Sequence, residues 1–406
     1  MKKSFTLFFT LLLAFGVSCF AANFQKETIT ENERSYLRYS FSNYDTSKPI
    51  SLLVLLHGMG GTMNDFDSTI TAHNMPQSYN LVVVCPQALP EQDSIVNAFN
   101  SSLPMFGYPK YNLNSVWNSG TSVPLDTQIT KNPMFIYFFP TIAAAGKVTV
   151  NSSVDDVKFI NDIINSTKQN FSIADNNVFI GGYSMGGSMC YKYISDPRQK
   201  ANAVSAIYGY KGHEVELTST PVPVCHFHSH DDDVVLFNGS VFNDSISKLI
   251  ADLAENTGHS DAVVENCPNI ADDGISVVLN KYETSGLPKI YFYEIDHATH
   301  DNILSGATND IDITEKMLNF FGMEKMATGL NFSKTNNLKI YPNPATDYLV
   351  TSEGGRYQIF NLLGEVVANG QTTADAKISL NGLIQGIYIL NLQTDGKNYV
   401  HKFSVQ

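Results

Sequence analysis

The stretch from Val178 to Gly187, VFIGGYSMGG, decides the fold of this 406-residue chain. It begins with a short apolar run typical of a buried strand, and it continues into the pattern G-x-S-x-G around Ser184. A serine on a tight turn between a strand and a helix needs small neighbours, and Gly182 and Gly186 supply that room. The stretch therefore predicts a strand–turn–helix unit. The alternative is a glycine-rich turn with an incidental serine, which the strand and helix around it disfavour.

Further short apolar runs lie on both sides of this unit. They lack polar alternation, which is typical of strands buried on both faces of a parallel sheet. Helical periodicity lies between them, with one apolar face over 157–164 and another over 246–253 that ends near Gly258. We expect Ser153 and Asp156 to cap the first of these helices. The alternation predicts a mostly parallel, doubly wound α/β sheet. The runs are Leu52–Leu56, Leu81–Cys85, Val178–Ile180, Val222–Phe227 and Ile290–Ile295.

The two ends of the chain carry different signals. Lys2 and Lys3 precede an apolar run and a group of small residues, which is the layout of a secretory signal peptide cleaved near Ala21. Cys19 leaves a lipoprotein signal as an alternative. Near the other end, short alternating strands broken by glycines predict a small all-β sandwich. We expect a signal peptide over 1–21, an α/β domain over 22–322, a linker over 323–337 and the sandwich over 338–406.

Charge and composition disfavour several classes of partner. The chain has 26 basic and 39 acidic residues and a formal net charge of −13, which disfavours nucleic acid as a partner. After the signal segment no apolar stretch is long enough to span a membrane, so the mature chain is expected to be soluble. Four cysteines remain after that segment, too few for a disulfide scaffold. The hydrophobic core must therefore provide the stability.

Two polar clusters follow predicted strands after Ser184. The segment 228–233 reads HSHDDD, and the segment 296–300 reads DHATH. A serine hydroxyl becomes a good nucleophile when a histidine takes its proton, and that histidine needs an acid to fix its tautomer. The order Ser, acid, His matches the order in which these clusters occur. A metal site at His228 and His230, beside the three aspartates, is the alternative.

A glycine-rich segment, HGMGG over 57–61, follows the first predicted strand. Backbone N–H groups in such a loop can face a substrate oxygen, as can the N–H groups at the start of the helix behind Ser184. We expect the N–H groups of Met59 and Met185 to form an oxyanion hole. His57 is expected to be a hydrogen-bonded structural histidine.

Five segments, in order, resemble the secreted esterase family that includes feruloyl esterases and polyhydroxyalkanoate depolymerase-like enzymes. The resemblance covers roughly residues 33–322 and implies an α/β-hydrolase fold with a Ser-His-Asp triad that needs no cofactor and no metal. Laid on the family pattern, the two clusters make Asp232 the acid and His300 the base. His297 stays an alternative, because relatives commonly have a glycine run before the histidine. The segments are Glu33–Tyr39, Leu55–Gly61, Asp155–Phe159, Gly182–Gly187 and the aspartate loop through Gly239.

The resemblance implies a secreted serine carboxylic ester hydrolase that acts on a polymer, with feruloyl or acetyl esters of plant cell-wall polysaccharide as the expected substrates. A polyhydroxybutyrate depolymerase, a serine peptidase and a non-catalytic carbohydrate-binding protein are the alternatives. Cys267 lies where relatives often begin a disulfide, but its partner is missing here. The long segment from Asn100 to Val154, with Trp117 and the aromatic run 135–139, is either a lid over the acyl pocket or a packed surface insertion.

Residues 338–406 resemble the type A sorting domain of the type IX secretion system found in Bacteroidetes. This resemblance implies export across the outer membrane by the type IX machinery, followed by release or attachment at the cell surface. It implies no catalytic contribution from the domain. The segments that carry it are YPNP over 341–344, IFNLLG over 359–364, LIQGIY over 383–388 and the terminal Lys402 and Phe403.

Overall fold

The computed structural model describes residues 24–42, 44–45, 47–106, 108–241, 243–271, 273–301, 310–323, 325, 338–361, 366–394 and 397–406. The chain divides into two compact units, residues 1–324 and 325–406. The expected signal peptide and most of the expected linker lie outside the described residues. The domain boundaries and the cleavage site therefore stay predictions.

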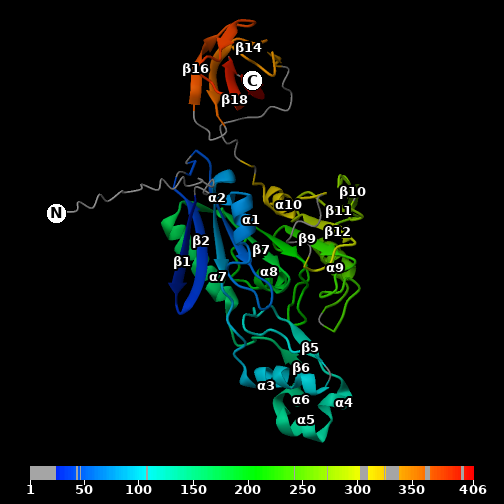
Figure 1. Cartoon of the computed structure of the whole chain (residues 1–406). Helices are drawn as coiled ribbons and strands as arrows, with labels where there is room; N and C mark the ends of the chain where they lie inside the picture. The colour runs from blue at the N-terminus through cyan, green and yellow to red at the C-terminus, as the bar shows by residue number, and fades with distance from the viewer. Residues whose placement is uncertain are drawn as a thin grey trace, which may run out of the picture. The chain divides into compact units, whose positions relative to one another are not determined.

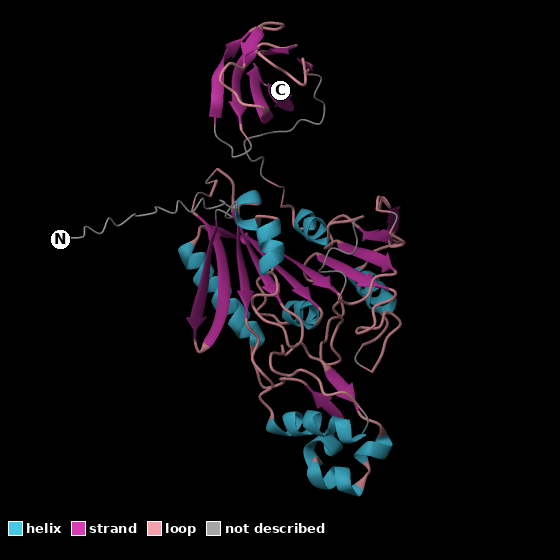
Figure 2. Cartoon of the chain, in the orientation of Figure 1, coloured by secondary structure: helices cyan, strands magenta, loops and turns pink. Residues whose placement is uncertain are grey.

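A ten-stranded sheet forms the centre of the first unit (Figures 1 and 2). Its order is β1-β2-β4-β3-β7-β8-β9-β12-β11-β10. The strands from β4 to β12 in this order are parallel, and the two strands at each edge are antiparallel. The mostly parallel sheet of an α/β-hydrolase fold is therefore confirmed. The strands are β1 Phe24–Glu31, β2 Arg34–Phe41, β3 Ile50–Leu56, β4 Leu81–Pro86, β7 Ile173–Tyr183, β8 Ala203–Ile207, β9 Val224–Ser229, β10 Val263–Asn266, β11 Ser276–Tyr282 and β12 Ile290–Asp296.

Helices cover both faces of this sheet. Successive side chains of β3 alternate between two cores: Leu52 and Leu56 pack in one core with α7, α8 and α9. Leu53 and Leu55 pack in the other core with α1, α2 and α10. Burial on both faces explains why the central strands are continuous apolar runs. The helices are α1 Asp67–Ala72, α2 Met75–Ser78, α7 Asp156–Asn170, α8 Met185–Ser195, α9 Ile246–Thr257 and α10 Ile313–Phe320.

The start of α7 corrects one prediction. Its N-cap is Asp155, whose carboxylate accepts a hydrogen bond of 2.9 Å from the N–H of Lys158. Ser153 is not the cap, and Asp156 is the first helical residue, with its carboxylate 2.8 Å from Arg34. An aspartate at either position satisfies the same sequence pattern, so only the backbone geometry distinguishes them.

An insertion lies between β4 and α7, on the side of the sheet where β4 ends. Figure 1 shows its helices gathered together beyond the two helical layers. Within the insertion, β5 and β6 pair as a short antiparallel two-stranded sheet. Its elements are α3 Ser94–Ser102, the 3-10 helix η1 Leu103–Phe106, β5 Ser122–Pro124, α4 Thr127–Thr130, α5 Pro133–Phe138, α6 Pro140–Ala145 and β6 Lys147–Thr149.

The second unit is built from strands alone in the residues that the structure describes. A three-stranded sheet, β13-β14-β17, and a four-stranded sheet, β16-β15-β18-β19, share one core that includes Leu349, Ile359, Ile378, Leu390 and Phe403. Two sheets around one core are a sandwich, which confirms the prediction. Residues 362–364 of the predicted sorting motif lie outside the described residues. The strands are β13 Ile340–Tyr341, β14 Tyr348–Thr351, β15 Gly355–Phe360, β16 Val366–Thr372, β17 Lys377–Ser379, β18 Gly386–Thr394 and β19 Lys397–Val405.

Candidate active site

Ser184 lies on the turn between β7 and α8. Its φ of +55° and ψ of −122° cost a non-glycine residue free energy and persist only where the surroundings fix them. One restraint is a hydrogen bond of 2.8 Å from the Ser184 N–H to the carbonyl of Ile207. The positions on either side of this turn must be glycine, because the backbone around them leaves no room for a Cβ atom. A Cβ on Gly182 would lie 2.2 Å from the carbonyl oxygen of Gly186, and one on Gly186 would lie 2.0 Å from that of Leu56.

The structure brings Ser184, His300 and Asp232 together at the carboxyl ends of parallel strands, where such sheets collect functional groups. Oγ of Ser184 lies 2.9 Å from Nε2 of His300. Nδ1 of the same ring lies 3.0 and 2.9 Å from the two carboxylate oxygens of Asp232. With the Nδ1 hydrogen donated to the carboxylate, Nε2 is free to accept the hydroxyl proton of Ser184. This is the tautomer that a general base requires.

Asp232 is held as a buried carboxylate and is 3% exposed. Its Oδ1 accepts hydrogen bonds of 2.9 and 2.8 Å from the N–H groups of Val234 and Val235. Burial raises the pKa of Asp232, but hydrogen bonds from His228 and His300 lower it by more, so the net pKa lies below its usual value. The group therefore stays ionised and can stabilise positive charge on His300.

The neighbouring aspartates fix the loop that carries His300. Oδ2 of Asp231 accepts a hydrogen bond of 2.8 Å from the N–H of His297 and lies 3.1 Å from Nδ1 of its ring. Oδ1 of Asp233 accepts a hydrogen bond of 3.2 Å from the N–H of His300. The side chain of His297 is 73% exposed and contacts Asp231, whereas His300 contacts Ser184. Nothing in the sequence pattern indicated these supporting roles for Asp231 and Asp233.

A series of hydrogen bonds continues from Asp232 into the core through two further histidines and a tyrosine. Nε2 of His228 lies 3.2 Å from Oδ2 of Asp232 and 2.8 Å from the carbonyl oxygen of Val235, and since both are acceptors, Nε2 must carry the hydrogen. Nδ1 of His228 then accepts from Nε2 of His226, at 3.3 Å. Nδ1 of His226 accepts from the hydroxyl of Tyr191, at 2.9 Å. Burial lowers the pKa of His226 well below its usual value, in agreement with a neutral ring.

Two tyrosines hold the ring and backbone of His300. The Tyr183 hydroxyl donates a hydrogen bond of 2.7 Å to the carbonyl oxygen of His300. The ring of Tyr208, which is fully buried, stacks on the imidazole with centroids 5.4 Å apart and planes 23° apart. The imidazole therefore has little freedom to rotate away from Ser184.

The glycine-rich loop after β3 lies against Ser184, since a Cβ on Gly58 would be 3.3 Å from the Cβ of Ser184. Within the described residues, the N–H groups of Met59 and Met185 donate no hydrogen bond. Both are therefore available to an incoming oxygen, and the N-terminal dipole of α8 adds positive potential behind Met185. Their assignment to an oxyanion hole stays a prediction.

His57 is a structural histidine that is 1% exposed. The N–H of Ala88 donates to its Nε2 at 3.1 Å, so the hydrogen is on Nδ1, which donates to the carbonyl of Gly58 at 2.7 Å. Burial lowers the pKa of His57. Nε1 of Trp117, from the insertion, donates a hydrogen bond of 2.8 Å to the carbonyl of His57. The base of the insertion thus supports the loop that carries Met59.

The sequence is compatible with a metal site at His228 and His230 and with disulfide bonds between the cysteines. In the described part of the chain, no three His, Cys, Asp or Glu side chains are placed to hold a metal ion. The ring of His228 instead contacts Asp232 in the buried hydrogen-bond series, and Nε2 of His230 lies 2.6 Å from Oε1 of Glu294. The four cysteines after the signal segment are free thiols, including Cys267.

Comparison with known proteins assigns the second unit. Residues 339–406 match the family model described as the secretion system C-terminal sorting domain. The second unit is a secretion sorting domain. The sorting domain marks this chain for secretion and links it to a secretion machinery. Every helix in the described part of the chain is too short or too polar to cross a membrane.

The chain is also similar in part to several esterases and hydrolases. A segment of 80 residues is 30% identical to the bifunctional acetylxylan esterase/xylanase XynS20E of Neocallimastix patriciarum, and it spans 20% of this chain and only 12% of that protein. Acetyl xylan esterase from Aspergillus awamori is a structural neighbour with a TM-score of 0.45 and 11% identity, over 73% of this chain and 99% of that one. S-formylglutathione hydrolase from Staphylococcus aureus has a TM-score of 0.37 and 12% identity, over 73% and 96%.

Proposed function

We propose that the first unit is a serine carboxylic ester hydrolase. The observation that carries this proposal is the contact between Ser184 and His300, at 2.9 Å, on a strained turn at the start of α8. A buried carboxylate, Asp232, orients the ring from its other nitrogen. Nucleophile, base and orienting acid in this geometry are the requirements of acyl transfer.

The proposed reaction has two steps. Oγ of Ser184 attacks the ester carbonyl carbon while Nε2 of His300 takes its proton, and the N–H groups of Met59 and Met185 bind the resulting oxyanion. The intermediate expels the alkoxide, which takes the proton from His300, and an acyl-enzyme remains. Water then attacks the acyl-enzyme with His300 again as base, and the acid and free Ser184 are regenerated. Asp232 stabilises the imidazolium in both steps.

Feruloyl or acetyl esters of plant cell-wall polysaccharide are the proposed substrates. Support comes from the family resemblance of the triad segments and from the partial similarity to a protein whose name includes acetylxylan esterase. A hydrolysis panel of methyl ferulate, acetylated xylan, hydroxybutyrate oligomers and an aminoacyl anilide tests this proposal. Turnover of the first or second compound supports it. Preference for the oligomers or the anilide would instead identify a polyester depolymerase or a peptidase.

The catalytic role of Ser184 is tested by Ser184→Ala. This variant should lose hydrolysis of p-nitrophenyl acetate while its circular dichroism spectrum and melting temperature stay close to those of the wild type. Ser195→Ala, at the other end of α8, is the matched control and should stay active, because its hydroxyl bonds the carbonyl of Lys192. Turnover by Ser184→Ala near the wild-type rate would contradict the mechanism.

We propose that the sorting domain uses the type IX secretion system and delivers the enzyme to the medium or the cell surface. The proposal rests on the match over residues 339–406 and on the YPNP and LIQGIY segments. A chain that ends after Gly322 should remain an active esterase, because the triad and both proposed oxyanion N–H groups precede this point. In the native host it should accumulate in the periplasm. Normal secretion of this shortened chain would contradict the sorting role.

A further inference from the structure

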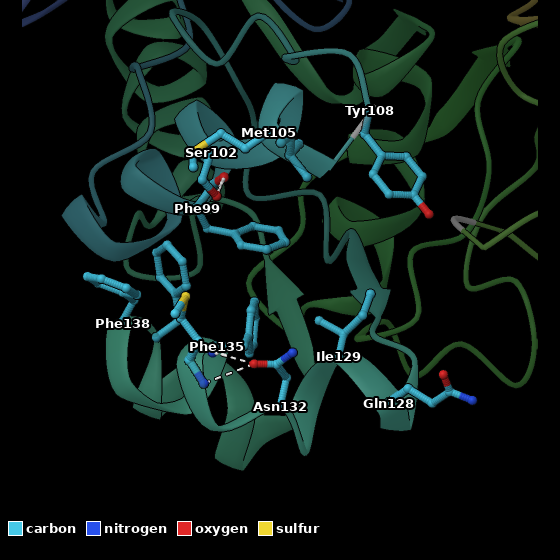
Figure 3. A pocket seen from close by; sticks show the side chains of 12 residues that line it. Phe99, Ser102, Met105, Tyr108, Gln128, Ile129, Asn132, Phe135 and Phe138 are labelled. Carbon is cyan, nitrogen blue, oxygen red and sulfur yellow. Dashed lines mark hydrogen bonds between the residues drawn. The ribbon is translucent and has the colours of Figure 1, made fainter.

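A cavity of about 670 Å³ lies inside the insertion, between α3, η1, α4 and α5 (Figure 3). Nine of its twelve lining residues are apolar or aromatic, and none is charged. The volume is within the range of roughly 300–1,000 Å³ that small-molecule sites occupy. None of the three triad residues lines it, so it is separate from the candidate active site.

Phenylalanine rings form one wall of the cavity. The rings of Phe99 and Phe135 have centroids 5.8 Å apart at 88°, and those of Phe99 and Phe139 lie 5.6 Å apart at 84°. Such edge-to-face clusters present ring faces and edges to which a further aromatic ring can pack. Met105 and Met134 also line the cavity, and their thioethers make favourable contacts with aromatic rings. The lining therefore favours an aromatic ligand over an aliphatic chain of the same size.

Several cavity side chains are too exposed to be explained by packing of the insertion. Met105 is 85% exposed, Met134 is 70% exposed and Phe138 is 63% exposed. Large apolar side chains grouped on a surface in this way mark binding sites. The whole segment 94–146 has three charged residues, Lys110, Asp126 and Lys131. Exposed large apolar side chains that form one patch, rather than single exposed ones, are the informative feature of this surface.

The polar groups of the cavity are neutral. Oδ1 of Asn132 accepts hydrogen bonds from the N–H groups of Met134 and Phe135, at 2.9 and 3.2 Å (Figure 3). In the described part of the chain, Nδ2 of Asn132 and the side-chain amide of Gln128 have no hydrogen-bond partner. These amides can meet hydroxyl or ether oxygens on a ring. A carboxylate would find no cation among the lining residues, so an uncharged ligand is favoured.

The cavity is connected to the candidate active site through a short stretch of chain. Tyr108 lines the cavity, and Asn112, four residues later, touches the glycine-rich loop that carries Met59. A Cβ on Gly60 of this loop would lie 2.4 Å from Nδ2 of Asn112. Four residues span at most about 14 Å, so Tyr108 at the cavity lies within about that distance of Asn112. A polymer that extends from Ser184 along this stretch of chain would approach the cavity.

We propose that this cavity is a second binding site, which takes an uncharged aromatic group such as a phenylpropanoid unit. On a polymeric substrate it would hold a ring next to the ester that Ser184 cleaves. That part of the proposal rests on the proposed esterase function, whereas binding of the ring itself does not. The insertion would thus select and retain aromatic-substituted polymer.

The test is a titration of the full chain carrying Ser184→Ala with coniferyl alcohol, measured by calorimetry or ligand-observed NMR. A ligand of this size should bind with a dissociation constant of the order of 1 mM. Met134→Gln with Phe138→Ser should weaken binding about fivefold or more. Both side chains are exposed, so these changes should leave the fold intact. Ile136→Ser is the matched control, because Ile136 is on the same helix and is 43% exposed but does not line the cavity.

Ligand chemistry gives a second comparison. Ferulate has the same ring as coniferyl alcohol but a carboxylate in place of the alcohol, and it should bind more weakly because the cavity has no cation. Equal affinity of the double variant and the Ile136→Ser control would overturn the proposal, as would no measurable binding to the Ser184→Ala chain. A hydroxybutyrate trimer that binds as tightly as coniferyl alcohol would also overturn it. Because Ser184→Ala is used throughout, these results do not depend on whether the wild type hydrolyses esters.

Discussion

His228 donates to Asp232 from the core side of the candidate triad: Nε2 of His228 lies 3.2 Å from Oδ2 of Asp232, the oxygen that Nδ1 of His300 contacts at 2.9 Å. The carboxylate thus lies between two imidazoles: His300 donates its Nδ1–H to it, and His228 shares its Nε2–H between it and the carbonyl oxygen of Val235. A carboxylate with its lone pairs fixed in this way keeps one orientation. We infer that His228 is a positioning residue for the pair formed by Asp232 and His300.

Replacing His228 with Phe should lower kcat by about 10- to 100-fold with little change in KM, because a hydrogen bond to a charged group is worth about 1.5–3 kcal/mol. Phenylalanine keeps the ring volume, so a large cavity is avoided. The measurement is steady-state kinetics on p-nitrophenyl acetate together with the melting temperature. His230→Phe is the control, because His230 is half-exposed and pairs with Glu294. An unchanged kcat in His228→Phe would show that Asp232 is positioned without it.

The two histidines of the last cluster should differ sharply in their effects. His300→Ala should lower turnover by several orders of magnitude, because no other described side chain accepts the proton of Ser184. His297→Ala should cost roughly tenfold or less, since its exposed ring pairs with Asp231 and, among the described residues, not with Ser184. Reaction of Ser184 with a fluorophosphonate reagent should follow the same ranking. The opposite ranking would assign the base to His297.

Gly186→Ala should damage both stability and activity. Its Cβ would lie 2.0 Å from the backbone oxygen of Leu56, which the sheet holds in place, so the turn and Ser184 must shift. We expect a loss of more than about 3 kcal/mol in the free energy of unfolding and more than about 100-fold in turnover. Gly181→Ala, on the preceding strand β7, is the control. Its Cβ would meet side-chain atoms of Met317 at 2.9 Å, and these can rotate away.

Stability should fall as the pH drops from 7 to 5, because burial keeps His226 neutral in the folded protein. Its pKa lies well below the usual 6.5, so in this window the unfolded chain binds a proton that the folded chain does not. One such proton changes the free energy of unfolding by up to about 1.4 kcal/mol per pH unit. In His226→Gln, the melting temperature should be lower overall but less dependent on pH.

His73 is the control for this measurement, because its contribution to stability should change with pH in the opposite direction to that of His226. Its Nε2 lies 2.7 Å from Oδ2 of Asp312, and this hydrogen bond raises the pKa of His73. The raised pKa stabilises the fold below pH 6.5, and this stabilisation is lost as the pH rises through the folded value. His73→Gln should therefore make the loss of melting temperature at acid pH steeper. The same pH dependence in His226→Gln and His73→Gln would contradict this account.

Local sequence patterns were sufficient to predict much of the sheet. Apolar runs of five or six residues, such as 52–56 and 290–295, identified strands because burial on both faces leaves no polar position in them. The strand β8 has no such signal, since Ala203, Ser205 and Ala206 are small and weakly apolar. The local pattern therefore does not predict this strand. Its small side chains suit its place between β7 and β9, beside the packed start of α8.

The sequence by itself determined which side chains could meet: Ser184 from its turn, and Asp232 and His300 from their positions after two strands of one parallel sheet. It determined this because the strand direction brings those chain ends to the same edge. Only the tertiary structure decided that His300 rather than His297 faces Ser184. It alone placed His226 behind His228, and it alone formed an open cavity in the insertion. These contacts join residues far apart in the chain, and they depend on packing and rotamers that no local pattern encodes.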